Sequence, residues 1–450
     1  MIKPFAPLGV LISLACFQAS ADADNNRTPD FLRDTKVSAT LRNFYFNRDF
    51  RHGHSSATGT NAFKPAALRS GRSEEWAQGI MTNLASGFTP GVIGVGFDAY
   101  GFLGIRLDSG GGRAGLRLMP LDGEGHPQTD YLKTGAAIKL KYESAVLQYG
   151  NLFPNVPVLA VNTARLFPSS ATGWMLGWDR GNVHVDAGHF YAQGGVDSTN
   201  NDDRLTLDYG LPIRLKAINY AGIRYSPSPE LKISGYASEL EDVWHQYYGG
   251  MSYRLPLSTK STLTLDGNLY RTTDTGQALA DSIRNTTWSL AVGYRYLAHT
   301  LTFAYQKVDS NEPMDWVGFG TQGGGVMLAN AVQYSTFTEA NERSLQLRYD
   351  LDFAPLGVPG LSLTTRYIRG DQISNSDSDN HFYIKRYSYP EGSNPRHWER
   401  DVEVRYVVQS GPARNLAVRL RQATHRASTG YRHVDIDEVR VILDYPLSIL

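Results

Sequence analysis

Along several segments of this chain, apolar side chains occupy every second position and basic side chains lie between them. This pattern restricts the fold more than any other feature. In the clearest example, residues 415–425, one face carries Leu416, Val418 and Leu420 and the other carries Arg419, Arg421 and His425. Successive side chains of a strand point to opposite faces, so one face suits an apolar medium and the other is positive. A soluble sandwich would have mixed charge outside, whereas here one sign repeats. The pattern favours a membrane barrel around water.

The same alternation recurs from one end of the chain to the other. It is found in 36–46, 138–142, 213–217 and 438–445, and in shorter form around Arg106, Arg117, Arg224, Lys232, Arg348 and Arg366. Turn-forming clusters separate the segments at 108–112, 200–203 and 226–229, as an array of hairpins requires. Because predicted strands lie near both ends of the sequence, we expect the first and the last to pair and close the sheet.

The first 21 residues have the parts of a secretory signal. Lys3 precedes an apolar run from Leu8 to Phe17, and Ala19-Ser20-Ala21 is a small-x-small cleavage site, which predicts a mature chain that starts at Asp22. The apolar run is too short to span a bilayer as a helix, and no later segment is long and apolar enough to do so. The only cysteine, Cys16, lies in this segment, so the mature protein has no thiol, which suits the periplasm and the outer membrane.

The composition agrees with a large pore formed by one domain, residues 22–450. The chain is 41% hydrophobic with 26 Tyr and 44 Gly, which is poor for a soluble core but natural where half of each strand faces water. The formal net charge of zero argues against nucleic acid as a partner. Basic residues fall on predicted strands, and acidic ones concentrate in turns such as 200–203 and 376–379. At roughly 24 residues per strand and loop, about 429 mature residues predict about 18 strands.

Four motifs resemble the OprD family of outer-membrane porins. They are Phe44-Tyr45-Phe46-Asn47-Arg48-Asp49-Phe50, the stretch 91–113, Tyr406-Val407-Val408-Gln409-Ser410-Gly411-Pro412, and Asp444-Tyr445-Pro446-Leu447. The resemblance implies an all-β fold, a transmembrane antiparallel β-barrel of 18 strands with inward-folded constricting loops, in the outer membrane of a Gram-negative bacterium. It also implies substrate-specific passive diffusion, in which a ladder of basic residues leads carboxylate-bearing solutes through a narrow constriction.

The candidate substrate-binding residues are the basic side chains of this ladder. The resemblance carries over Arg42, Arg405, Arg419 and Arg421, and parity alone adds Lys139 and Arg440. A low-dielectric wall strengthens the attraction between a guanidinium and a carboxylate, and the planar fork of arginine can donate two hydrogen bonds to one carboxylate. The alternative is that these residues balance acidic loops or form ion pairs within the lumen.

Two segments resemble the constricting loops of the family. The first is 157–168, which contributes Arg165 as a further candidate, and the second corresponds to 313–330. Relatives often have an Asp-Ser pair in the second loop that helps to form an acidic pocket. This chain has Thr321-Gln322-Gly323-Gly324 at that place, and Asp315 is the candidate substitute.

The predicted function is passive diffusion of small carboxylate-containing solutes, either amino acids and short peptides or aromatic acids, without catalysis and without a cofactor. The predicted partners are these solutes, outer-membrane lipid and lipopolysaccharide, and the barrel-assembly machinery, and we expect a monomer. A general, unselective porin is the closest alternative, because the loops decide the pore width.

Two further alternatives come from other classes of protein. An outer-membrane hydrolase would need a nucleophile elbow of the Gly-x-Ser-x-Gly type, which we do not find. His52-Gly53-His54 has no neighbouring carboxylate or cysteine cluster, so we predict a solvated loop there and no metal site. A soluble periplasmic β protein would leave the apolar outward faces as large patches in water.

Overall fold

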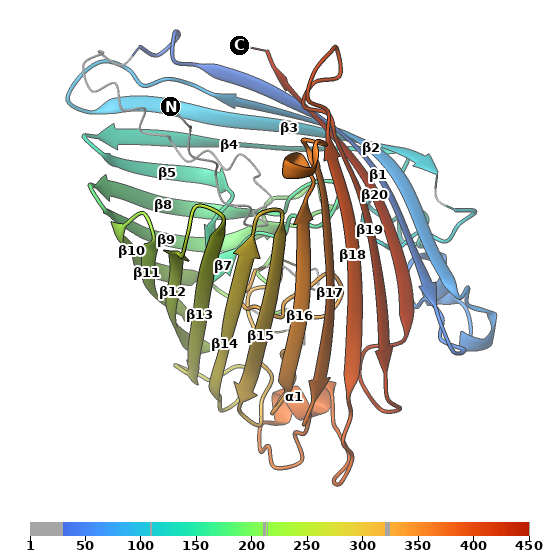
Figure 1. Ribbon diagram of the computed structural model, residues 1–450. Coiled ribbons are helices and arrows are strands. Elements are labelled where there is room, and N and C mark those ends of the chain that lie inside the picture. The colour runs from blue at the N-terminus through green and yellow to red at the C-terminus, as the bar shows by residue number, and fades with distance from the viewer. Residues whose placement is uncertain (1–29, 109, 210–212, 214, 320–324, 450) are drawn as a thin grey trace.

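The computed structural model describes residues 30–449 apart from 109, 210–212, 214 and 320–324, so the predicted signal at 1–21 lies outside the described residues. Its main element is an 18-stranded antiparallel sheet closed into a barrel, which confirms the predicted fold (Figure 1). The strands of the barrel are β1 (Lys36–Phe50), β2 (Arg72–Ala85), β3 (Gly94–Asp108), β4 (Asp130–Tyr142), β5 (Ala145–Leu152), β8 (Ser170–Arg180), β9 (Val183–Gly194), β10 (Ile218–Ser228), β11 (Leu231–Leu240), β12 (Trp244–Pro256), β13 (Ser261–Asp274), β14 (Arg284–Tyr296), β15 (His299–Asp309), β16 (Arg343–Asp352), β17 (Leu361–Asp371), β18 (His397–Val407), β19 (Ala417–Ala427) and β20 (Ile436–Ser448).

The remaining elements are short and lie in the connections. In the loop after β5, β6 (Asn155–Val156) pairs with β7 (Leu159–Ala160). The helices are α1 (His381–Arg386) and three 3-10 turns, η1 (Gly59–Phe63), η2 (Ala66–Leu68) and η3 (Ala354–Leu356). None of the helices in the described part of the chain has the length and apolar character needed to cross a membrane.

The first and last strands close the barrel, as the sequence predicts. β1 pairs with β20 in an unbroken register from Ser38 opposite Ser448 to Phe50 opposite Ile436. β1 also pairs with β2 on its other side, so neither of its edges is left unpaired. Closure removes the free edges that would otherwise expose backbone polar groups to lipid.

The connections differ in length at the two ends of the barrel. Turns such as 143–144 and 181–182 lie at the end that holds the carboxyl end of β20, which we call the terminus end (Figure 1). The connections 153–169, 310–342 and 372–396 lie at the opposite end, which we call the loop end. In bacterial outer-membrane barrels the short turns face the periplasm and the long loops face the outside.

Side chains alternate between the two faces of the wall. On β16, Leu345 and Leu347 are 43% and 54% exposed on the outer face, whereas Ser344 and Gln346 are buried on the inner face. The outer face is apolar because it contacts lipid, and the inner face is polar because it contacts the water-filled lumen.

Two of the alternating segments in the sequence do not form strands. β10 begins only at Ile218, and the described part of 213–217 is loop, with Leu215 and Ala217 buried in the interior. Arg117 lies in the connection between β3 and β4 at a φ of 68° and forms an ion pair with Asp197. In both places the alternating sequence belongs to a loop whose apolar side chains pack in the interior, although the same pattern also fits a strand.

Glycine and tyrosine pair across neighbouring strands on the inner face, which explains part of the unusual composition. Gly222 on β10 lies opposite Tyr236 on β11, and a methyl group at Gly222 would overlap the tyrosine ring. The same arrangement places Gly188 under Tyr220, Gly135 under Tyr100 and Gly104 under Tyr131. A tyrosine covers the glycine of its partner strand, so the wall keeps its packing despite the missing side chain.

Apolar packing fills one side of the interior. Inward tyrosines of β10–β13 and Trp244 form the largest apolar cluster with residues of three loops, 156–161, 205–209 and 314–319. The hydroxyl of Tyr270 donates to the carbonyl of Pro157 at 3.0 Å and accepts from the backbone N–H of Met327 at 2.9 Å. The loops are thereby attached to this wall, and the strands half-way round the barrel, β17–β20 and β1, carry most of the charged inward side chains.

Candidate functional site

The loop after β5, residues 153–169, folds into the barrel and packs there by its apolar side chains. Phe167 is fully buried, and its ring centroid lies 5.4 Å from that of Phe102 and 5.3 Å from that of Tyr131. Both partners are inward side chains of the wall, on β3 and β4. The segment that resembles the first constricting loop therefore does fold inward.

Arg42 on β1 joins this loop to the wall. Its Nε donates to Asp444 Oδ1 on β20 at 2.6 Å, and its Nη1 donates to the backbone carbonyls of Arg165 and Leu166 at 3.2 and 3.4 Å. The guanidinium is thus engaged by one carboxylate and two carbonyl groups. This geometry gives Arg42 a loop-positioning role in addition to its place in the predicted ladder.

Three guanidinium groups surround the ring of Phe46 at the narrowed part of the lumen. The Cζ atoms of Arg440, Arg165 and Arg48 lie 4.5, 5.4 and 5.5 Å from the ring centroid. Glu438 forms ion pairs with Arg48 at 2.8 Å and with Arg440 at 2.6 Å. Burial, together with the positive charges of Arg440 and Arg48, lowers the pKa of loop residue Arg165 to about 9. The site is therefore crowded with positive charge.

The long connection between β15 and β16, residues 310–342, reaches the same wall. The Nε2 of Gln333 donates to Glu438 at 3.0 Å, and the next two backbone N–H groups donate to the two oxygens of Glu399 at 2.8 Å each. The Cζ of Arg48 also lies 5.0 Å from the ring centroid of Tyr334. The two inward loops thus reach the same part of the wall, the first through Arg165 beside Phe46 and the second through Gln333 beside Glu438, and together they narrow the lumen there.

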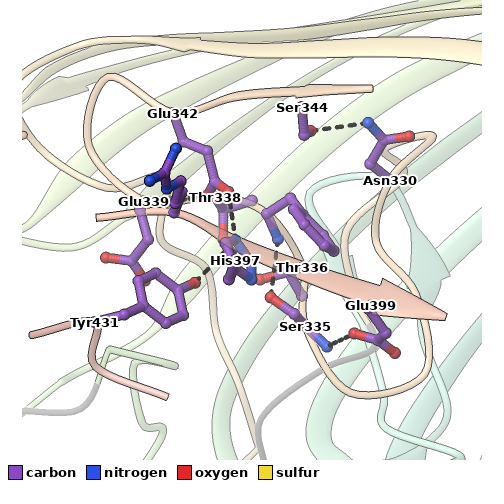
Figure 2. A network of polar contacts seen from close by, with 12 residues as sticks. Asn330, Ser335, Thr336, Thr338, Glu339, Glu342, Ser344, His397, Glu399 and Tyr431 are labelled. Carbon is purple, nitrogen blue, oxygen red and sulfur yellow. Dashed lines mark hydrogen bonds and ion pairs between the residues drawn. The ribbon is translucent and has the colours of Figure 1, made fainter. Parts of the chain in front are cut away.

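A buried polar network holds the end of the second loop against the wall (Figure 2). Glu342 lies 2.6 Å from Nε2 of His397 on β18, and the hydroxyl of Tyr431 lies 3.2 Å from the same nitrogen. Asn330, further back in the loop, donates to the hydroxyl of Ser344 at 2.8 Å. Because these groups are buried, each needs its partner, and the loop position is strongly specified.

Raising the pH from 5 to 9 is expected to loosen the loop at Glu342. Burial raises the pKa of this carboxyl to about 8 and outweighs the attraction of Arg432 and Lys307. A carboxyl whose pKa is higher in the folded than in the unfolded chain stabilises the fold below its unfolded pKa, and this contribution is lost as the pH rises through about 8. Single-channel conductance should therefore be larger and less steady at pH 9 than at pH 5.

The control for this pH dependence is Glu342→Gln. The amide keeps a hydrogen-bonding group beside His397 and does not titrate, so the part of the conductance change that Glu342 causes should be lost and the change between pH 5 and pH 9 should become smaller. A pH response as large as that of the unsubstituted chain would show that another group controls the loop.

Arg405, Arg419 and Arg421 form a cluster on the inner faces of β18 and β19. Arg421 lies 2.9 Å and Arg419 3.6 Å from Glu403, and Arg405 is the direct cross-strand neighbour of Arg419. Within the described ranges, no carboxylate forms an ion pair with Arg405. Two of the three guanidinium groups therefore share one carboxylate and the third has none in the described part of the chain, so the cluster keeps an excess of positive charge beside the lumen.

Lys139 faces inward on β4 but stands apart from this cluster, since β20, β1, β2 and β3 separate β4 from β19. Its Nζ lies 2.6 Å from Asp98 Oδ1, and Gln148 donates to the other oxygen at 3.0 Å. For Lys139, Arg42 and Arg440, the geometry is that of the ion-pair alternative stated from the sequence.

Asp315 lies buried between loops rather than beside the lumen. Its Oδ1 accepts from the backbone N–H groups of Asp208 and Tyr209 at 3.1 Å and of Trp316 at 2.8 Å. Its Oδ2 accepts from the hydroxyl of Tyr383 at 3.2 Å, and burial raises the pKa of the carboxyl to about 6. This geometry gives Asp315 a part in loop packing, and its place in an acidic pocket for a solute stays a prediction. Thr321-Gln322-Gly323-Gly324 lies outside the described residues.

Several residues of the constriction were missed by the sequence reasoning. Arg48 shares its parity with Arg42 on one strand, so a consistent count in steps of two would have found it. The expectation that acidic residues concentrate in turns is wrong for this wall, because Glu399, Asp401 and Glu403 face inward on β18. Asp401 pairs with Arg366 at 2.7 Å. Their parity with Arg405 was the available signal.

A closed barrel with an apolar outer face, a charged inner face and loops that narrow the passage defines a channel-forming porin of the bacterial outer membrane. The chain belongs to the OprD family: the family described as "outer membrane porin, OprD family" matches residues 29–449. It is 41% identical to Porin D of Pseudomonas aeruginosa over the whole of both chains. These relatives are channels rather than enzymes, and they place the protein in the outer membrane of a Gram-negative bacterium.

Solved structures of the same family share the fold. The crystal structure of OprD from Pseudomonas aeruginosa is 39% identical, with a TM-score of 0.79 over 94% of this chain and 98% of the other. The structure of OpdK with vanillate, from the same organism, is 32% identical, with a TM-score of 0.80 over 93% of this chain and 100% of the other.

Proposed function

We propose that this porin selects small solutes that carry a carboxylate group and lets them diffuse passively into the periplasm. The observation that carries the proposal is the cluster of Arg405, Arg419 and Arg421, in which Arg419 and Arg421 share the carboxylate of Glu403 and Arg405, beside Arg419, has no ion-pair partner among the described residues. A passing carboxylate completes the charge balance of this cluster. Arginine suits the task because its planar donor fork meets a carboxylate with two hydrogen bonds and it keeps its charge.

Acidic partners beside the basic residues favour amino acids and short peptides within the carboxylate class. Asp444, Glu438 and Asp98 each lie within 2.6 Å of a basic inward side chain. A solute with a carboxylate and an ammonium group can bind both the basic and the acidic member of such a pair, whereas an aromatic acid can bind only the basic member. The relative OpdK, whose structure contains vanillate, supports aromatic acids as the second candidate.

Single-channel conductance in a planar bilayer tests this function. The detergent-purified protein is titrated at low salt with arginine, benzoate and a neutral sugar. A small conductance that arginine reduces more than benzoate, and the sugar does not reduce, is expected for an amino acid channel. Reduction by benzoate alone would assign the channel to aromatic acids, and a large conductance indifferent to all three would make it a general porin.

We further propose that residues 1–21 direct export and are removed, and that residues 22–450 form one unit that the barrel-assembly machinery inserts. The signal-like composition of 1–21 and the continuous pairing of strands from β1 to β20 support this proposal.

A further inference from the structure

The strands β18, β19, β20 and β1 lie side by side in the barrel (Figure 1). An open groove of about 490 Å³ lies on the outer face of these four strands, at their loop end. Its lining includes Arg51, Trp398, Arg400, Arg426 and Asp437. Arg51 follows the end of β1, and the other four side chains lie at outward-facing positions of their strands. The groove thus faces the membrane side rather than the lumen. The groove is therefore separate from the pore.

Cations outnumber carboxylates in this groove. Asp437 is shared by Arg51 at 2.6 Å and by Arg426 at 2.9 Å. Arg400 donates only to the neutral side chain of Gln422, at 3.3 Å, and in the described part of the chain no carboxylate forms an ion pair with it. The groove has one other carboxylate, Asp49, which lies 3.7 Å from Arg51.

A fourth arginine extends the groove towards β17. Arg369 is exposed, and it is the cross-strand neighbour of the groove residue Trp398. Over the described ranges, no ion pair involves Arg369. Two arginines of this surface, Arg369 and Arg400, thus have no carboxylate partner.

The level of the groove in the membrane follows from the sequence of its own strands. Towards the terminus end, the next outward residue after Arg400 is Val402, and the next after Gln422 is Leu420. Charged outward side chains cost about 2–4 kcal/mol at the middle of a bilayer and almost nothing at its interface. The change from charged to apolar marks the edge of the hydrocarbon layer, and the groove lies directly outside it, at the headgroups of the outer leaflet.

We propose that this groove binds the phosphorylated headgroup of a glycolipid of the outer leaflet. Phosphate matches the excess of guanidinium groups, whose planar forks bind phosphate oxygens with two hydrogen bonds. Trp398 supplies an amphipathic ring of the kind that is enriched at membrane interfaces. The groove opens beside the lipid tails, so a glycolipid can keep its acyl chains in the bilayer while its phosphate reaches the arginines. This site is independent of the solute that the pore accepts.

Native mass spectrometry of the detergent-purified porin, titrated with bis-phosphorylated lipid A, tests this site. Lipid A from which the phosphates have been removed should bind about tenfold more weakly, which corresponds to one lost charge-assisted contact. The double variant Arg369→Gln with Arg400→Gln should lose about the same factor for the phosphorylated lipid. Neither residue holds an ion pair in the described structure, so the barrel should fold, and an unaltered single-channel conductance verifies this.

The matched control is Arg271→Gln with Arg284→Gln. Both residues are exposed at the loop end, on β13 and β14, and their loss removes the same charge away from the groove. Binding of lipid A to this variant should stay as in the unsubstituted chain. An equal loss in the control would mean non-specific attraction, and no loss in the groove variant would refute the site.

Two further outcomes would also overturn the proposal. Displacement of the lipid by millimolar inorganic phosphate would assign the groove to free anions rather than to a lipid. A dimer that Arg369→Gln with Arg400→Gln dissociates would assign the face to an interface between two copies of this chain.

Discussion

Replacing Arg419 and Arg421 together by alanine is expected to lower the uptake of an anionic solute about tenfold more than that of a neutral solute of equal size. The change leaves Glu403 with no ion-pair partner among the described residues and converts an excess of positive charge into near balance. At an effective dielectric of about 20, two charges at 4 Å attract by about 4 kcal/mol, so losing a part of this attraction accounts for a tenfold effect. Swelling of liposomes that contain the protein measures both rates.

Arg419→Lys with Arg421→Lys is the control for this experiment. It keeps the two charges and loses the planar donor forks, so it should retain most of the preference for the anion. Raising the salt to 1 M, where the Debye length is about 3 Å, should reduce the preference of the unsubstituted protein. Equal losses of the anion and of the neutral solute in the alanine variant would mean that the pair shapes the pore without steering charge.

Replacing Phe167 by alanine is expected to raise the single-channel conductance several-fold. The ring is fully buried between Phe102 and Tyr131, and the loss of a buried phenylalanine typically costs about 3–5 kcal/mol. This cost falls on the loop 153–169 alone, because the strands that carry the two partners remain paired along their length. A loop released from the wall no longer narrows the lumen.

Phe303→Ala is a matched control for this prediction. Phe303 lies on the outer face of β15 and is 52% exposed to the membrane side, so its loss should leave the conductance unchanged. An unchanged conductance in Phe167→Ala would show that the hydrogen bonds from Arg42 to the loop backbone are enough to hold the constriction.

The sequence predicted the barrel and much of its charged wall because both follow from a local rule. A strand that separates lipid from water must alternate at period two, and residues such as Arg419, Arg421 and Arg440 can be assigned to the inner face by counting. The rule failed at 213–217, where a loop packs Leu215 into the interior and gives the same pattern without a strand. An alternation of side chains at period two therefore identifies a strand only where the backbone of the segment also pairs with an adjacent strand.

The state of each charged side chain could not be predicted in the same way. Arg42 meets Asp444 at a separation of 402 residues, and it meets the loop at Arg165 from 123 residues away. Asp315 was a candidate for an acidic pocket, but its carboxylate is occupied by backbone N–H groups that belong partly to a different loop. Such contacts depend on how long connections fold back, and no short-range pattern records this.

The sequence by itself determined that this chain forms an outer-membrane barrel with a row of basic side chains on its inner face, since the alternation of side chains and the medium on each side are properties of single strands. Only the tertiary structure decided which arginines keep an excess of charge, how two loops reach the wall beside Phe46 and Glu438, and where a charged groove forms on the outer face. These features depend on groups from distant parts of the chain that meet only when the barrel closes and its loops fold inward.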